Sequence, residues 1–182
     1  MPDELRKLLV EHFRWVDPGP AASHLVSDVS GWWREPEILA RLGPALADLF
    51  RPDRPTVVVS PEATGLMLGP LVATALGVGF VPAYKKRPDG RLIAGPTTWA
   101  STTSDYRGRT LTLGVRDRHL RPGDRVLVVD DWVATGAQLR ALYQVVAARS
   151  AEPVGTAAVI ADCPAGLAAE LRVRALLTGR EI

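Results

Sequence analysis

Two adjacent carboxylates, Asp130 and Asp131, are the residues of this 182-residue chain best suited to chemistry. They follow a short apolar run at residues 126–129 that is rich in β-branched side chains and therefore predicts a buried strand. Carboxylates at the end of such a strand can accept hydrogen bonds from the two hydroxyl groups of a ribose. They can equally hold the water molecules around Mg²⁺, and the residues alone leave both uses open.

A turn of small residues follows this acid pair and predicts a site for an anion. Thr135 and Gly136 form the turn, and it precedes apolar residues at the spacing of an amphipathic helix, namely Leu139, Leu142, Tyr143 and Val146. The free N–H groups of residues 135–138 are expected at the N-terminus of this helix, where the helix dipole favours a phosphate. Ligands of open parallel sheets bind at the carboxyl ends of the strands, where this turn lies.

A second strand, turn and helix start occurs earlier in the chain. Residues 56–60 predict a buried strand, residues 61–65 (PEATG) a turn, and the apolar residues up to Leu76 a helix. The N–H groups of Ala63, Thr64 and Gly65 therefore form a second candidate anion site by the same physics.

Strands alternate with helices along the chain, which predicts an α/β fold with a parallel, twisted sheet flanked by helices. Further helices and strands are expected at residues 3–13, 36–50, 78–81, 111–115, 154–160, 167–171 and 173–177. Residues 15–35 are dense in turn formers and predict irregular structure. Residues 84–110 are rich in Gly, Pro, Ser and Thr, and a segment this long between two strands favours a functional lid.

Composition indicates an ordinary globular protein, with 47% hydrophobic and 23% charged residues. The length suits a single domain over residues 1–182. A formal net charge of +2 gives no argument for nucleic acid, and the one cysteine allows no internal disulfide and no multi-cysteine zinc site. No apolar run approaches the roughly 20 residues that span a bilayer, so we expect a cytoplasmic protein with no membrane partner.

Several stretches together resemble the type I phosphoribosyltransferases, and the adenine phosphoribosyltransferases most closely. The central one is residues 128–136 (VVDDWVATG), which resembles the motif that binds phosphoribosyl pyrophosphate (PRPP). The others follow the order of the family and are residues 28–30 (DVS), 61–70 (PEATGLMLGP), 76–82 (LGVGFVP), 95–101 (GPTTWAS) and 105–106 (DY). This resemblance covers roughly residues 20–160.

The resemblance implies a Mg²⁺-dependent enzyme that transfers 5-phosphoribose from PRPP to a purine-type base, adenine or a related one, and releases pyrophosphate. It implies an N-terminal hood (residues 1–35), an α/β core (residues 36–182) that includes the lid, and a homodimer. The expected 5′-phosphate site comprises Ala134, Thr135, Gly136, Ala137 and Gln138. The expected pyrophosphate site comprises Glu62, Ala63, Thr64, Gly65, Lys85 and Arg91.

The same resemblance implies that Asp105, Asp130 and Asp131 are catalytic. Asp105 would handle the ring proton of the base, and the acid pair would hold the metal through water. The base would contact Val26, Ser27 and Trp32.

This chain departs from the family pattern at several of these positions. The family carries arginine where this chain has Ser27 and Thr64, a basic residue where it has Tyr84, and glutamate where it has Asp105. The missing arginines leave two alternatives open beside the enzyme for a purine. One is a regulator that binds PRPP or a nucleotide without turnover, and the other is a biosynthetic enzyme for an acceptor that is not a nucleobase.

Overall fold

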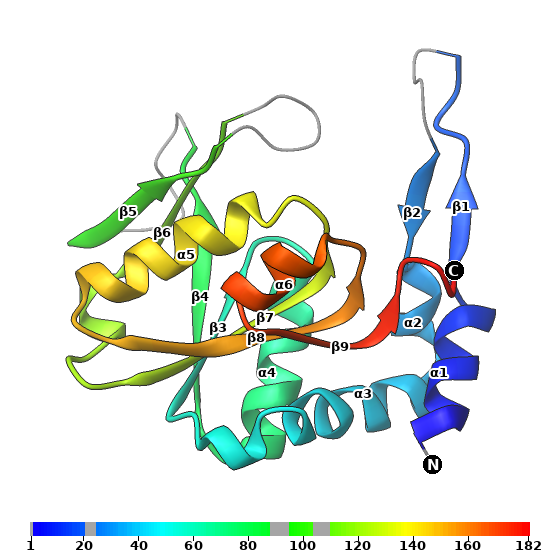
Figure 1. Cartoon of the computed structure of the whole chain (residues 1–182), viewed down its shortest axis with the longest axis horizontal. Coiled ribbons are helices and arrows are strands. Elements are labelled where there is room, and N and C mark those ends of the chain that lie inside the picture. Colours follow the sequence, from blue (N-terminus) through cyan, green and yellow to red (C-terminus); the bar gives the residue numbers. More distant parts are fainter. Residues whose placement is uncertain (1, 21–24, 88–94, 104–109) are drawn as a thin grey trace.

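The computed structural model describes residues 2–20, 25–87, 95–103 and 110–182, and in these ranges a seven-stranded sheet forms the centre of the molecule (Figure 1). Its strand order is β5-β6-β4-β3-β7-β8-β9. The strands are β3 (Val57–Pro61), β4 (Gly79–Lys85), β5 (Thr97–Ser101), β6 (Thr112–Arg116), β7 (Arg125–Val133), β8 (Glu152–Ala161) and β9 (Val173–Thr178). The α-helices are α1 (Pro2–Glu11), α2 (Ser30–Arg34), α3 (Pro36–Asp48), α4 (Gly65–Leu76), α5 (Ala137–Ala148) and α6 (Ala165–Glu170).

Most neighbouring strands in this sheet are parallel, which confirms the predicted fold class. The pairs β3–β4, β7–β8 and β8–β9 are each joined through a helix, and β3 also pairs in parallel with β7. The exception is one edge, where β6 runs antiparallel to both β4 and β5. The parallel part brings the carboxyl ends of β4, β3 and β7 side by side.

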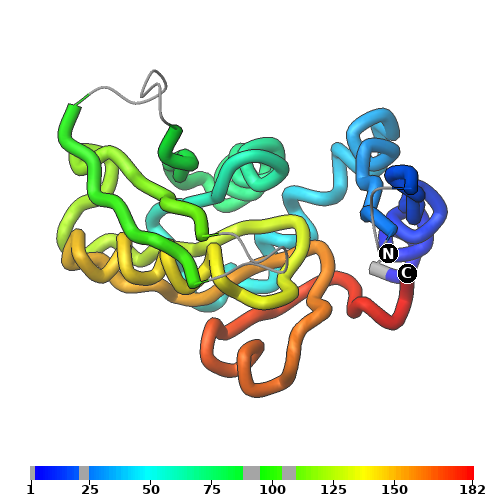
Figure 2. The backbone as a smooth tube through the Cα atoms, turned by 90° about the horizontal axis from the view of Figure 1, so that it is seen from above, coloured from blue at the N-terminus to red at the C-terminus, as the bar shows by residue number. Residues whose placement is uncertain are grey.

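Alternation of apolar side chains along the strands builds a core on each face of the sheet. On β3, Val58 joins the core formed with α1, α3 and α4, whereas Val57 and Val59 join the core formed with α5 and α6. Leu127 and Val128 of β7 divide between the two cores in the same way. Figure 2 shows α4 and α5 on opposite sides of the sheet. Such strands are covered on both faces, which explains their almost continuous apolar sequences.

A hood stands beside the sheet and consists of α1, α2 and a two-stranded antiparallel ribbon of β1 (Arg14–Val16) and β2 (Val26–Asp28) (Figure 1). The prediction of irregular structure for residues 15–35 was therefore wrong. These elements are too short to leave a periodic pattern, and all three residues of β1 are exposed.

The two ends of the chain meet at this hood (Figure 2). Arg6 of α1 donates a hydrogen bond to the carbonyl oxygen of Leu176 at 2.5 Å and forms an ion pair with Glu181. The C-terminal segment is thereby tied to α1. In the described ranges, no helix has both the length and the apolar character needed to cross a bilayer.

The segment at residues 84–110 is also more ordered at its ends than the sequence predicts. The strand β4 continues to Lys85, and β5 pairs with β6 over five residues from Thr97 to Ser101. Polar threonines and serines make β5 look like a loop, but an edge strand needs only one apolar side and one hydrogen-bonded neighbour. Residues 88–94 and 104–109, within the predicted lid, lie outside the described ranges.

Candidate active site

The turn after β7 has a backbone conformation that only glycine adopts easily. Gly136 precedes the first residue of α5 with φ at 69°, in the left-handed region. A Cβ at this position would lie 2.8 Å from a methyl carbon of Leu167 and 2.9 Å from one of Leu171. The turn therefore packs directly on α6, and a larger residue is excluded by both conformation and space.

This turn presents backbone donors with no partner among the described residues. Across the described ranges, the N–H groups of Ala134, Thr135, Gly136 and Gln138 donate no hydrogen bond, and that of Ala137 lies 3.4 Å from Thr135 Oγ1. Unpaired N–H groups at the start of a 12-residue helix form an anion site. Gln138 also keeps its buried Oε1 without a partner among the described residues.

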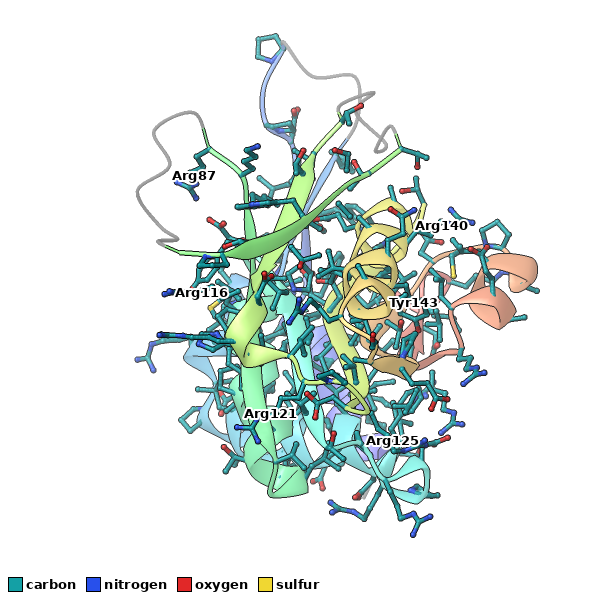
Figure 3. The ribbon with its side chains drawn as sticks, turned by 90° about the vertical axis from the view of Figure 1, so that its left-hand side faces the viewer. Arg87, Arg116, Arg121, Arg125, Arg140 and Tyr143 are labelled. Carbon is teal, nitrogen blue, oxygen red and sulfur yellow. The ribbon has the colours of Figure 1, made fainter. Side chains whose placement is uncertain are left out.

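Arg140 contacts the carbonyl side of this turn from α5 (Figure 3). It donates to the carbonyl oxygen of Thr135 at 3.2 Å and to both carboxylate oxygens of Glu170 at 2.7 Å. The bidentate pair joins α5 to α6, so the turn is fixed on its carbonyl side while its N–H groups stay unpaired. Neither Arg140 nor Glu170 could be found from the sequence, because their spacing of 30 residues shows no pattern.

The acid pair lies at the end of β7, where the two carboxylates have different surroundings. Asp130 is only 7% exposed and accepts a hydrogen bond from the Asp131 N–H at 3.0 Å. Burial, followed by the nearby Asp131 carboxylate, raises the pKa of Asp130 well above its ordinary value, and the positive charge of Lys85 opposes this rise. Asp130 therefore favours a cation or a hydrogen-bond donor at this position.

The second predicted anion site lies beside the first. In the described ranges the N–H groups of Ala63, Thr64 and Gly65 have no acceptor. A Cβ added to Gly65 would lie 3.3 Å from the carbonyl oxygen of Val129, just before the acid pair. Loop 62–65 thus lies against the end of β7 just before the acid pair, as expected from the adjacency of β3 and β7.

Glu62 orders this loop by binding the end of β4. Its N–H donates to the Ala83 carbonyl oxygen at 2.9 Å, its Oε2 accepts from the Lys85 N–H at 3.0 Å, and its Oε1 pairs with Arg87. The Glu62 carboxylate therefore contacts protein cations and amides. The place of Glu62 in a pyrophosphate site stays a prediction, and these contacts suit it to position other residues there.

A cavity of about 420 Å³ lies between the hood and the turn after β7. Trp15, Leu25, Val26 and Ser27 line its hood side, and residues 130–139 line the other. The predicted base contacts Val26 and Ser27 and the predicted phosphate site thus face the same space, next to the acid pair.

The prediction that Trp32 contacts a base was wrong. Trp32 is fully buried, and its Nε1–H donates to the Leu9 carbonyl oxygen at 2.9 Å, so its ring fills the interior of the hood. Two other tryptophans line the cavity instead, Trp15 from β1 and Trp132 from β7. Their ring centroids are 5.8 Å apart with planes at 70°. The position of Trp132 directly after the acid pair was the available signal.

The two carboxylates suit Mg²⁺ only in company with a substrate. Within the described ranges no group of three or more His, Cys, Asp or Glu side chains is arranged to hold a metal. Magnesium commonly takes one or two carboxylates and completes its shell with water and substrate phosphates. Asp130 and Asp131 provide that number beside two loops whose N–H groups have no acceptor among the described residues, so the residues present fit this ion.

Comparison with known proteins identifies the family. The model of the phosphoribosyl transferase domain matches residues 34–176. The chain belongs to this family. A curated adenine phosphoribosyltransferase from Acidothermus cellulolyticus is 33% identical over 159 residues, which is 87% of this chain and 86% of that protein.

Solved structures of the family share the whole fold. The adenine phosphoribosyltransferase from Rhodothermus marinus is 30% identical, with a TM-score of 0.80 over 97% of this chain and 99% of its own. The enzyme from Leishmania donovani is 26% identical, with a TM-score of 0.81 over 98% of this chain and 81% of its own. The likeness includes the hood, which the family model leaves mostly unmatched.

Two of the residues predicted for this phosphoribosyltransferase site, Arg91 and Asp105, lie outside the described ranges. The remaining predicted residues, Trp32 excepted, lie around the carboxyl ends of β3, β4 and β7 or on the hood strand that faces them.

Proposed function

We propose that this phosphoribosyltransferase transfers the 5-phosphoribosyl group of PRPP to adenine or a closely related purine and releases pyrophosphate. The observation that carries the proposal is the single cavity that joins unpaired backbone donors, the acid pair and an aromatic hood. The names of the similar proteins from Acidothermus cellulolyticus and Rhodothermus marinus favour adenine as the acceptor.

Each part of PRPP has a proposed partner at this site. Residues 134–138 bind the 5′-phosphate, and the N–H groups of residues 63–65 with Lys85 bind the pyrophosphate. Asp130 and Asp131 face the ribose hydroxyls and hold Mg²⁺ through water. When bound, the metal neutralises negative charge on the leaving pyrophosphate.

The acid pair also suits the charge that develops during transfer. The sugar becomes cation-like as its bond to pyrophosphate breaks, and carboxylates fixed beside it stabilise that charge without having to reorient. The base enters between the hood and the turn, where Trp15, Val26 and Trp132 offer apolar surface for a planar ring. Ser27 replaces a charged residue at the rim, so ring stacking contributes most of the base affinity.

The homodimer implied by the family and the cytoplasmic location expected from the sequence belong to the same proposal. Sedimentation equilibrium of the purified protein tests the first, because a 19.6 kDa species at all concentrations contradicts it. Fractionation of cells that produce the protein tests the second.

The decisive experiment measures pyrophosphate release from PRPP and Mg²⁺ with adenine, guanine, hypoxanthine, xanthine, uracil or orotate. We expect release with adenine, and none from the double variant Asp130→Asn, Asp131→Asn. Release with a different base names another acceptor and corrects the adenine assignment. If no base supports turnover, the proposal is wrong, and calorimetric binding of PRPP then separates a regulator from an enzyme for an acceptor outside this set.

A further inference from the structure

Among its residues in the described ranges, which leave out Arg91, the proposed pyrophosphate site has little positive charge. Loop 62–65 contributes backbone donors but only one charged side chain, the negative Glu62, whose side chain is 12% exposed. Lys85 lies close enough to Asp130 to oppose the rise in its pKa, so part of its charge is balanced there. A negatively charged diphosphate would therefore be bound more tightly if a side-chain cation acted there together with Mg²⁺.

Three consecutive cations at the end of β4 differ in where they point. Lys86 Nζ lies 5.7 Å from the centroid of the Trp99 ring, on the side of β5. Arg87 instead forms an ion pair with Glu62, and the Glu62 carboxylate also accepts the Lys85 N–H at 3.0 Å. Alternation along an extended chain puts Lys85 and Arg87 on one side and Lys86 on the other. Figure 3 shows Arg87 at the upper end of β4.

The Arg87 guanidinium keeps donors free while it contacts Glu62. Its contact with Glu62 uses one nitrogen, and its side chain is 53% exposed. A guanidinium carries five N–H donors in a planar fork that matches phosphate oxygens. The carboxylate thus holds the group beside the N–H donors of residues 63–65, with one side open to solvent.

We propose that Arg87 binds the pyrophosphate group of PRPP, and that Glu62 positions its guanidinium for this contact. The inference rests on the proposed function and assigns a residue that the family motifs do not include. It also explains how the site works with threonine at position 64: the cation is supplied by the end of β4.

Steady-state kinetics of Arg87→Gln and Lys86→Gln test the inference, since the two variants remove the same charge from neighbouring residues. For Arg87→Gln we expect the KM for PRPP to rise about 10- to 100-fold, the loss of a hydrogen bond to a charged group, with the KM for the base changed less than about twofold. Lys86→Gln should change neither value by more than about twofold. Equal KM values for PRPP in the two variants would overturn the assignment.

A rescue experiment distinguishes two roles of Arg87: binding of PRPP, or only a structural contact with Glu62. The double variant Thr64→Arg, Arg87→Gln restores a cation to the loop without restoring the Glu62 pair. We expect the double variant to bind PRPP at least about tenfold more tightly than Arg87→Gln does. No recovery, together with an equal loss in Glu62→Gln, shows that Arg87 only holds the loop and overturns the proposal.

Failure of the proposed function is recognised separately. If the wild-type protein releases no pyrophosphate with any base, calorimetric titration with magnesium pyrophosphate replaces the kinetics. Weaker binding in Arg87→Gln than in Lys86→Gln then supports Arg87 on its own, and equal binding overturns it.

Discussion

At the scale of single residues, burial separates the two carboxylates of the acid pair. Asp130 is almost inaccessible, whereas Asp131 is half-buried. An ionised carboxylate loses most of its hydration in such a position, and a neighbouring negative charge adds to the cost. Ionisation of both carboxylates is therefore unfavourable in the ligand-free protein. A bound cation or the hydroxyl groups of a ribose would lower this cost.

Replacement of Asp130 by Asn is expected to stabilise the ligand-free protein while it abolishes turnover. The unfolded chain titrates this carboxyl near 3.8, and the folded protein does so at a higher pH. The wild-type protein thus loses stability as the pH rises through the raised pKa, and the Asn variant does not. Thermal unfolding without metal should show a higher Tm for Asp130→Asn at neutral pH. The rise should be about 2–4 °C for each kcal/mol gained in the free energy of unfolding.

Two results check that explanation. The Tm difference should shrink as the pH falls from the raised pKa toward 3.8 and should disappear below 3.8, because the wild-type carboxyl is then protonated in both states. Asp131→Asn, at the more exposed position, should shift the Tm less. A lower Tm for Asp130→Asn at neutral pH contradicts the account.

Gly136→Ala is expected to damage both stability and PRPP binding. A non-glycine residue at this φ costs about 1 kcal/mol or more, and its Cβ would also press on Leu167 and Leu171. We expect a loss of about 2–4 kcal/mol in the free energy of unfolding and a raised KM for PRPP. Gly123→Ala is the control, since Gly123 has φ at 83° but no atom within 4 Å of the added Cβ. Denaturant unfolding of both variants measures the difference, and equal losses would exclude the packing contribution.

The chemistry-bearing residues of the two anion loops could be located from sequence, but the aromatic residues of the base site could not. The order of strand, small turn and helix is local, so Thr135, Gly136 and Thr64 fall where the pattern predicts. Trp32 and Trp15 carry the same side chain, and packing in the core with α1 and α3 makes the first inaccessible. Tertiary burial of this kind leaves no local pattern.

At the scale of elements, the parallel strands and the antiparallel strand β6 were predictable, whereas β1, β2 and β5 were not. The strands β3, β7 and β8 are covered on both faces and therefore show apolar runs of several residues. The ribbon β1–β2 has three residues in each strand, and β5 is polar. These short or polar strands are the ones that shape the rim of the site, so its outline depended on the structure.

The ribbon predicts a variant that affects the base alone. Trp15 is 46% exposed on β1 and lines the cavity, so Trp15→Leu removes a ring surface and little of the core. Because stacking of a base on an aromatic ring contributes about 1–3 kcal/mol, the KM for adenine should rise about 5- to 100-fold. The KM for PRPP should stay within about twofold.

The matched control for this variant is Val16→Ala on the same ribbon, where the side chain is exposed and does not line the cavity. Steady-state kinetics with each substrate varied in turn separates the two KM values. A rise in the KM for PRPP instead of that for adenine would place the base elsewhere.

At the scale of the whole molecule, the site is assembled from segments far apart in the sequence. The loops 62–65 and 134–138 meet because β3 is the neighbour of β7, and the hood reaches them because its α1 packs in the core with α3 and Trp132. PRPP binding to both loops should therefore stabilise the fold as a unit.

This expectation can be measured by thermal unfolding with PRPP and Mg²⁺. At about 100 times its Kd the ligand adds about 2.7 kcal/mol, which corresponds to a rise in Tm of about 5–11 °C for a chain of this size. Asp130→Asn, Asp131→Asn should show a much smaller rise. A PRPP-induced shift of the same size in this variant would mean that the acid pair does not contact the ligand.

The contact between Trp15 and Trp132 gives the protein an optical property of its own. Two indole rings at this distance and inclination couple their excited states, so the pair should produce a split signal in ultraviolet circular dichroism. One ring belongs to the hood and the other follows the acid pair, and any displacement of the hood changes their mutual orientation. Trp32 and Trp33 form a second close pair inside the hood, so the difference between the spectra of the wild-type protein and Trp15→Leu is the quantity that registers the position of the hood.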